Sequence, residues 1–223
     1  MAALIEFQNV TVKEQQNTIL KKVTFSVSKG EKVVLYGKSG SGKTTILTTL
    51  LGGHNPLEGV VKYNGILLNR ESIHKIRTSI AFIGQEPVLG EGTVENVLLF
   101  PFNFRANYPN KPDKNALIES LEKAGLSQSL LDSSVSGISG GEKQRIAIAR
   151  ALLLNKNVFC IDEATSALDS QSAELIVSVF QNKEFTVLSV SHDPRWFNIA
   201  SRFIKIDNGQ IIDDTDDRTK VKM

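Results

Sequence analysis

Three short stretches of the chain are mainly apolar and lack polar alternation. They are "VVLY" at 33–36, "NVFCI" at 157–161 and "FTVLSV" at 185–190. Each has about the length of a strand, and strands without polar positions are usually buried on both faces of a parallel sheet covered by helices. The pattern therefore predicts an α/β fold around a mainly parallel sheet.

Polar and apolar residues alternate in segments near both ends of the chain. These segments are "LIEFQNVTV" at 4–12, "VTFSVSKG" at 23–30 and "RFIKIDNGQII" at 202–212. Such alternation indicates antiparallel strands, and Asn208-Gly209 is a turn that joins two strands in a hairpin. We expect an N-terminal antiparallel β-subdomain and a C-terminal hairpin.

Helical periodicity dominates the middle of the chain. It covers "TVENVLLF" at 93–100, "KNALIESLEKAGL" at 114–126 with a stop at Gly125, and "ISGGEKQRIAIARALLL" at 138–154. We therefore expect one domain over 1–223, in which 84–155 is an inserted α-helical subdomain. Residues 1–83 and 156–223 form the core.

Composition narrows the classes of function. The chain has 223 residues, 41% hydrophobic and 22% charged, which is ordinary for a globular domain. A net charge of +2 with scattered Lys and Arg gives no reason to expect a nucleic-acid partner. The single cysteine, Cys160, lies in an apolar run, so we expect a small buried side chain and no disulfide within the chain.

No apolar run approaches the roughly eighteen residues that a membrane span needs. The start "MAALIEFQNV" also lacks the basic and apolar regions of a signal peptide. We expect a cytoplasmic protein, which leaves open docking onto a membrane protein.

A phosphate-binding loop follows the first apolar run. "VVLYGKSGSGKTT" matches G-x-x-x-x-G-K-[ST] and precedes the helical "TTILTTLLG". The alternative is a Gly/Ser-rich turn that caps a helix, but strand, loop and helix in this order favour phosphate binding. The residues expected to hold a nucleotide are Gly37, Lys38, Ser39, Gly40, Ser41, Gly42, Lys43, Thr44 and Thr45.

Two acidic residues follow the second apolar run. We expect Lys43 to reach the β and γ phosphates and Thr44 to ligate Mg²⁺, with Asp162 holding the same ion, through water. Glu163 is then the general base or water-positioning residue. Taken alone, two acids at a strand end are more often solvated, so the assignment depends on the phosphate loop.

A second candidate phosphate site opens the last predicted helix. Ser139 and Glu142 form S-x-x-E, a capping box. The cap does not explain Gly140 and Gly141, because each glycine costs about 1 kcal/mol relative to alanine in a helix interior. Close approach of a large anion to the backbone explains them better.

With these residues in place, the chain resembles the nucleotide-binding domains of ABC transporters. The motifs occur in the family's order: "GKSGSGKT" as Walker A, Gln85 in "FIGQEPVL" as the Q-loop, "ISGGE" as the signature, "VFCIDEA" as Walker B, "SALD" ending at Asp169 as the D-loop, and His192 in "VSHD". The resemblance covers nearly the whole chain and implies a P-loop NTPase core.

The resemblance implies a head-to-tail homodimer, in which each ATP lies between the Walker A loop of one chain and the signature of the other. Ser139 and Gly141 would contact the γ-phosphate across the interface. Gln85 would contact Mg²⁺ or water, and His192 the γ-phosphate; alone, they are a polar loop residue and a turn histidine. The cofactors implied are ATP and Mg²⁺. The other partner would be a transmembrane permease, which places the chain on the inner face of the cell membrane.

The family pattern is not followed everywhere. The segment "TVKEQQNT" at 11–18 has no aromatic residue to stack on adenine, and Glu14 lies near the expected position. The signature has Ile138 and Glu142 where the consensus has Leu and Gln; Glu142 still completes the capping box. How adenine is recognised is left open.

The segment "GEGTVENVLLFPFNFRANYPNKP" at 90–112 is similar to the ATPase subunits of bacterial FetAB-type metal exporters, which suggests metal or iron export. One alternative is a soluble, non-transport ABC-type ATPase of translation or DNA repair, although tandem cassettes and long coiled-coil insertions are missing. Another is a P-loop module that senses nucleotide without hydrolysing it. Glu163 and His192 argue against that alternative.

Overall fold

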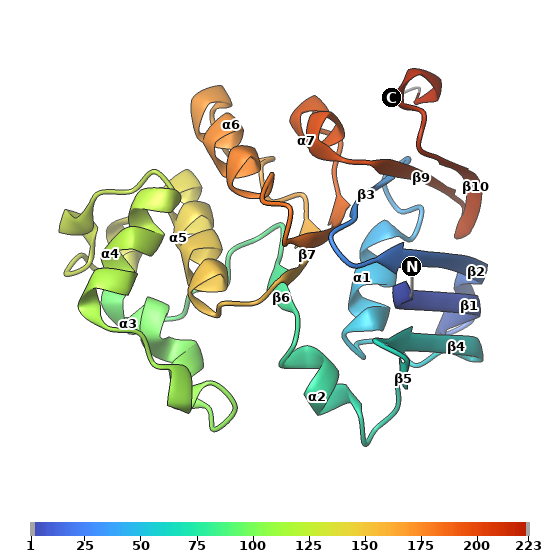
Figure 1. Cartoon of the computed structure of the whole chain (residues 1–223), viewed down its shortest axis with the longest axis horizontal. Coiled ribbons are helices and arrows are strands. Elements are labelled where there is room, and N and C mark those ends of the chain that lie inside the picture. Colours follow the sequence, from blue (N-terminus) through green and yellow to red (C-terminus); the bar gives the residue numbers. More distant parts are fainter. Residues whose placement is uncertain (1–2, 222–223) are drawn as a thin grey trace.

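The structure, a computed structural model, describes residues 3–221 and has two β-sheets (Figure 1). The larger sheet has six strands in the order β10-β9-β3-β8-β7-β6, and all neighbours are parallel except β10 with β9. The strands are β3 (Lys32–Tyr36), β6 (Ala81–Ile83), β7 (Val158–Asp162), β8 (Thr186–Val190), β9 (Arg202–Asp207) and β10 (Gln210–Thr215). The predicted α/β fold with a mainly parallel sheet is confirmed.

The smaller sheet is antiparallel and has the order β2-β1-β4-β5. Its strands are β1 (Ala3–Glu14), β2 (Asn17–Ser28), β4 (Glu58–Tyr63) and β5 (Ile66–Leu67). The predicted N-terminal antiparallel subdomain is therefore confirmed, with two further strands from residues 58–67.

Three helices, α3 (Val94–Leu99), α4 (Lys114–Lys123) and α5 (Gly140–Leu153), lie together at one end of the molecule, away from the antiparallel sheet (Figure 1). The others are α1 (Lys43–Leu50), α2 (Ile73–Arg77), α6 (Ser170–Val179) and α7 (Pro194–Ile199). Short 3₁₀ turns cover Phe100–Asn103, Tyr108–Asn110, Gln128–Leu130, Val135–Gly137 and Arg218–Lys220. No helix among residues 3–221 is long and apolar enough to span a bilayer.

The six-stranded sheet is buried on both faces, as the apolar runs predict. Val33 and Leu35 of β3 pack in one core with α1 and the antiparallel sheet. Val34 and Tyr36, which alternate with them, pack in a second core with residues of α5, α6 and α7. The sheet thus joins the antiparallel strands to the helical end of the molecule.

Two features of the large sheet differ from the expected pattern. Strand β6 was not predicted, because it has only three residues and Phe82 is exposed. The alternating segment 202–212 forms the predicted hairpin, but β9 also pairs with β3 in parallel and so extends the central sheet.

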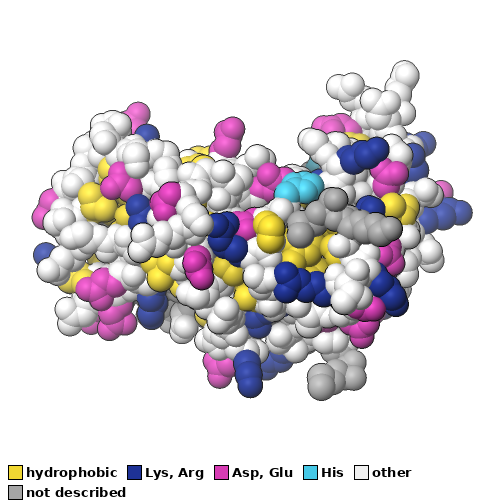
Figure 2. Space-filling model, turned by 90° about the horizontal axis from the view of Figure 1, so that it is seen from above, with side chains coloured by type: hydrophobic (Ala, Val, Ile, Leu, Met, Phe, Trp, Pro, Cys, Tyr) yellow, Lys and Arg dark blue, Asp and Glu magenta, His cyan; other side chains and the backbone are white. Residues whose placement is uncertain are grey.

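On the face seen in Figure 2, the surface carries interspersed positive and negative side chains.

Candidate functional site

The candidate residues of the core meet at the carboxyl edge of the parallel sheet. The phosphate loop follows β3, Glu163 follows β7, His192 follows β8, and Gln85 lies two residues beyond β6. Because these strands are parallel, their carboxyl ends lie on the same edge, where α/β proteins bind ligands. The register pairs Asp162 with Val190 and brings the segments after β7 and β8 side by side.

The phosphate loop depends on glycine at two positions where another residue would not fit. Gly37 has φ 139°, and a Cβ there would lie 2.0 Å from the carbonyl oxygen of Ile206. Gly42 has φ 102°, and its Cβ would lie 2.9 Å from Leu20 Cδ2. Strand β9 and hairpin β1–β2 therefore shape the loop directly.

The Lys43 side chain lies at the centre of this loop and is 5% exposed. Its Nζ donates hydrogen bonds to the carbonyl oxygens of Gly37 at 2.7 Å and Lys38 at 2.8 Å. Burial lowers the pKa of Lys43, while the carboxylates of Glu163 and Asp162 act in the opposite direction. The loop thus holds a buried ammonium that can interact with an anion.

Thr44 and Asp162 are in direct contact, although they are far apart in sequence. Thr44 Oγ1 donates to Asp162 Oδ2 at 2.9 Å. The pKa of Asp162 is raised above its usual value, chiefly because the carboxylate is buried. The charge of Glu163 acts in the same direction, and the hydrogen bond from Thr44 and the charge of Lys43 act against it. A hydroxyl and a buried carboxylate side by side are the hard oxygen donors that Mg²⁺ prefers.

Glu163 and His192 face each other beside this pair. His192 Nε2 lies 3.9 Å from Glu163 Oε1, and their side chains are 54% and 27% exposed. Glu163 has φ 45°, a conformation uncommon for glutamate, and its backbone N–H donates to Val190 O at 2.9 Å. Both side chains are thus partly exposed at the same edge of the sheet as the phosphate loop.

The predicted capping box of α5 is present. Ser139 Oγ accepts from the Glu142 backbone N–H at 3.3 Å, and the Glu142 carboxylate accepts from the Ser139 backbone at 3.1 Å and from its hydroxyl at 2.6 Å. These bonds from Ser139 hold the pKa of Glu142 below its usual value. No hydrogen bond among residues 3–221 joins 139–142 to the phosphate loop.

The contacts of this chain do not require the glycines of the signature. A Cβ at Gly140 would meet no atom within 4 Å, and one at Gly141 would meet the Ala167 carbonyl oxygen at an ordinary 3.5 Å. Neither residue has a positive φ. Alanine would fit both positions and favour the helix, so packing within the described residues does not explain the pair.

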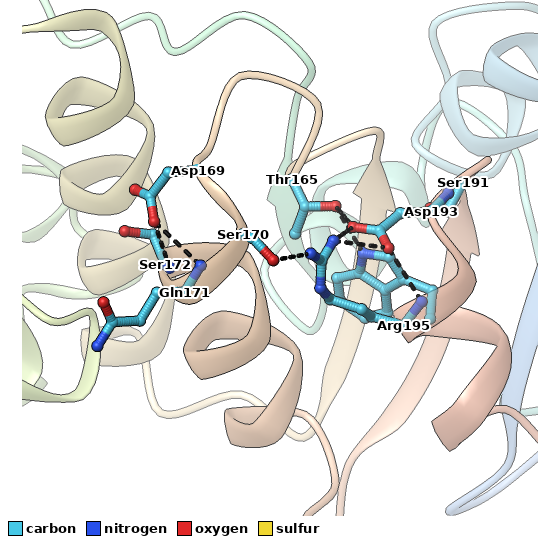
Figure 3. Close-up of polar contacts among 9 residues, drawn as sticks. Thr165, Asp169, Ser170, Gln171, Ser172, Ser191, Asp193 and Arg195 are labelled. Carbon is cyan, nitrogen blue, oxygen red and sulfur yellow. Dashed lines mark hydrogen bonds and ion pairs between the residues drawn. The ribbon is translucent and has the colours of Figure 1, made fainter.

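Asp169 caps α6: its carboxylate accepts from the backbone N–H groups of Gln171 and Ser172 (Figure 3). The hydrogen bonds at Ser172 lower the pKa of Asp169.

Gln85 is exposed, and no hydrogen bond to its side chain is present among residues 3–221. The ligand-binding roles expected of Asp169 and Gln85 stay predictions.

Two residues not singled out in the sequence connect the signature helix to the Q-loop. Gln144 is fully buried and donates to the Gly84 carbonyl oxygen at 3.0 Å, and Arg150 donates to that of Val88 at 2.9 Å. Burial lowers the pKa of Arg150. Both bonds use backbone acceptors on a loop about sixty residues away, so no local motif indicates them.

Comparison with known proteins identifies the class to which this fold and site belong. The family model described as "ABC transporter" matches residues 20–166. The fold also matches the dimeric post-hydrolysis structure of the ATP-binding cassette MJ0796 bound to ADP and Pi, with a TM-score of 0.82, 29% identity, and coverage of 95% of this chain and 97% of that one. The chain belongs to the ABC transporter family and is an ABC ATPase domain.

Two relatives differ in how much of their own length this chain covers. The chain is 31% identical over 220 residues to "Energy-coupling factor transporter ATP-binding protein EcfA1" of Ligilactobacillus salivarius (strain UCC118), covering 95% of this chain and 77% of that protein. It is 30% identical over 225 residues to "ABC transporter C family member 14" of Dictyostelium discoideum, covering 94% of this chain. It spans only 16% of the length of that second relative.

Proposed function

We propose that the chain binds and hydrolyses MgATP at the carboxyl edge of its large sheet and thereby drives a membrane transporter. The observation that carries this proposal is the convergence of Thr44 with Asp162 and of Glu163 with His192 beside the buried ammonium of Lys43. A module that only senses nucleotide would not need a carboxylate and an imidazole beside the phosphate loop. Trapping of the nucleotide-bound state by Glu163→Gln, argued in the Discussion, tests the proposal.

The position of each side chain and the family resemblance together support a role for it in this reaction. Lys43 and the N–H groups of the loop bind the β and γ phosphates, and Glu163 accepts a proton from the attacking water. His192 holds the γ-phosphate and orients Glu163. Thr44 and Asp162 would hold Mg²⁺, which would neutralise developing phosphate charge.

The proposed site is completed by a second copy of the chain. The signature glycines have space around them and no packing role within the described residues, which is what backbone contact with a phosphate would require. Ser139, Gly140, Gly141 and Glu142 would then face the γ-phosphate on the partner's loop, and Asp169 would lie at the same interface. ATP would hold the dimer together, and hydrolysis would release it.

We also propose that the surface between the Q-loop and α3 binds a transmembrane permease, which places the chain on the inner face of the membrane. A cavity of about 510 Å³ lies there, lined by residues that include Val88, Phe100 and Arg150. Val88 is 82% exposed and Phe100 53%. The similarity of 90–112 to FetAB-type subunits supports metal, specifically iron, as the transported substrate.

This surface gives a testable prediction in cells. Val88→Glu places a charge among exposed apolar residues and should shift most of the chain from the membrane pellet to the supernatant. Cells with this variant as their only copy should accumulate iron as strongly as cells without the chain. Ile212→Glu, at another exposed apolar position in β10, is the matched control and should stay in the pellet. Normal pelleting of Val88→Glu would contradict the proposed surface.

Base selectivity gives another prediction. The β1–β2 connection offers no aromatic ring, so phosphates and Mg²⁺ should dominate binding, and kcat/KM for GTP should lie within about tenfold of that for ATP. A lost stacking contact is worth roughly 1 kcal/mol, and tenfold corresponds to about 1.4 kcal/mol. Parallel kcat/KM measurements decide the point. A much larger preference for ATP would mean that another residue supports adenine.

A further inference from the structure

A chain of hydrogen bonds joins the segments that follow β7 and β8. Thr165 Oγ1 donates to Asp193 Oδ2 at 2.9 Å and accepts from the indole Nε1 of Trp196 at 3.2 Å. Thr165 is 4% exposed and Trp196 1%. The Thr165 hydroxyl therefore has its donor and acceptor roles fixed, and it points toward Asp193 in Figure 3.

Asp193 is the centre of this network. Its carboxylate also accepts from the Arg195 backbone N–H at 2.9 Å and from Arg195 Nη1 at 3.0 Å, and its own backbone N–H donates to Ser191 Oγ at 3.0 Å. Arg195 Nη2 continues to Ser170 Oγ at 2.5 Å. Figure 3 shows Arg195 between Asp193 and Ser170, so the network reaches the amino end of α6.

The network is adjacent to the residues assigned to hydrolysis but does not include them. Thr165 lies two residues after Glu163, Asp193 directly follows His192, and Ser170 directly follows Asp169. The ladder between β7 and β8 ends at Asp162 and Val190. Among the described backbone hydrogen bonds, only that from Glu163 to Val190 joins the two segments beyond this point.

We propose that Thr165 and Asp193 are positioning residues that hold Glu163 and His192 at their working separation, and that Arg195 extends this restraint to Ser170, which directly follows the D-loop. The proposal rests on the proposed roles of Glu163 and His192. Their side chains contact each other only at 3.9 Å, and the backbone of Glu163 is in a left-handed conformation. A pair placed this way needs support from its neighbours, and the Thr165–Asp193 bond supplies it by joining the two segments that carry these residues.

The first test removes the hydroxyl and keeps the shape. Thr165→Val should lower kcat for ATP by about 10- to 100-fold, since small displacements of reacting groups have effects of this size. The Kd for a fluorescent ATP analogue should stay within about threefold, because the phosphate loop is untouched. Thr165→Ser keeps the hydroxyl and should restore kcat to within about threefold of wild type.

Thr186→Val is the matched control. Thr186 is also a buried threonine whose hydroxyl is hydrogen bonded, in this case to the Gly30 N–H at 2.8 Å, but it lies at the opposite end of β8. This variant should lose stability without a comparable loss of kcat at saturating ATP. A kcat for Thr165→Val within about threefold of wild type, or an equal loss in Thr165→Ser, would overturn the proposal.

Two further variants keep the proposal open to refutation. If Thr165→Val does not fold, Arg195→Met tests the same network from a side chain that is 33% exposed, and kcat should fall by about 3- to 10-fold. An unchanged kcat would overturn the proposal. Glu163→Gln is measured alongside: normal turnover in that variant contradicts the proposed function, whereas an inactive Glu163→Gln with an active Thr165→Val contradicts the positioning role alone.

Discussion

Glu163→Gln should leave ATP binding intact, reduce turnover by about 10²- to 10⁴-fold and trap an ATP-bound dimer. The amide has the size of the carboxylate but does not accept a proton from water. Lys43, Thr44 and the loop remain, so the phosphates are still bound. Size-exclusion chromatography with ATP and Mg²⁺ should show a dimer that the wild-type protein forms only transiently.

Glu174→Gln is the control, because Glu174 is an exposed residue of α6 outside the proposed site. It should hydrolyse ATP at the wild-type rate. Normal turnover in Glu163→Gln would contradict the role of Glu163 as base and with it the proposed function. A variant that stays monomeric at high ATP would contradict the trapped dimer. Since Gln144 and Arg150 connect α5 to the Q-loop, the trapped state should also keep these two segments together.

The core of the site could be predicted because local pattern and topology agree. The phosphate loop is a continuous motif between a strand and a helix, and Asp162 ends a strand whose other four residues are apolar. The rule that ligands bind at the carboxyl ends of parallel strands then places Asp162 near Thr44. In the structure, Thr44 Oγ1 lies 2.9 Å from Asp162 Oδ2. The short apolar strands β3, β7 and β8 were predictable for the same reason.

Features that depend on register between distant segments could not be predicted. Thr165 and Asp193 are 28 residues apart and meet only because β7 and β8 pair with Asp162 opposite Val190. A polar residue on a helix, such as Gln144, is expected on the solvated face, whereas tertiary packing buries it completely against the Gly84 carbonyl. Strand β6 is too short for any periodicity to be read.

Mixing two inactive variants should restore ATP-dependent dimerisation if the phosphate sites form between chains. Lys43→Ala removes the ammonium from the loop. Gly141→Asp places a carboxylate where the γ-phosphate would lie, and its Cβ has room, so the chain should fold. Each variant alone has a lesion in both composite sites of a homodimer and should not dimerise with ATP.

In the mixed dimer, one site holds both lesions and the other holds none. Sites formed within single chains would leave every site damaged, so the mixture separates the two arrangements. Chains with different fluorescent labels, mixed with ATP and Mg²⁺, should show energy transfer that neither variant gives alone. Dimerisation is the better readout than turnover, because strongly coupled sites can bind ATP at one position without hydrolysing it. Labelled variants that never pair, while wild-type chains do under the same conditions, would reduce Ser139 to Glu142 to the helix cap that the capping box already forms.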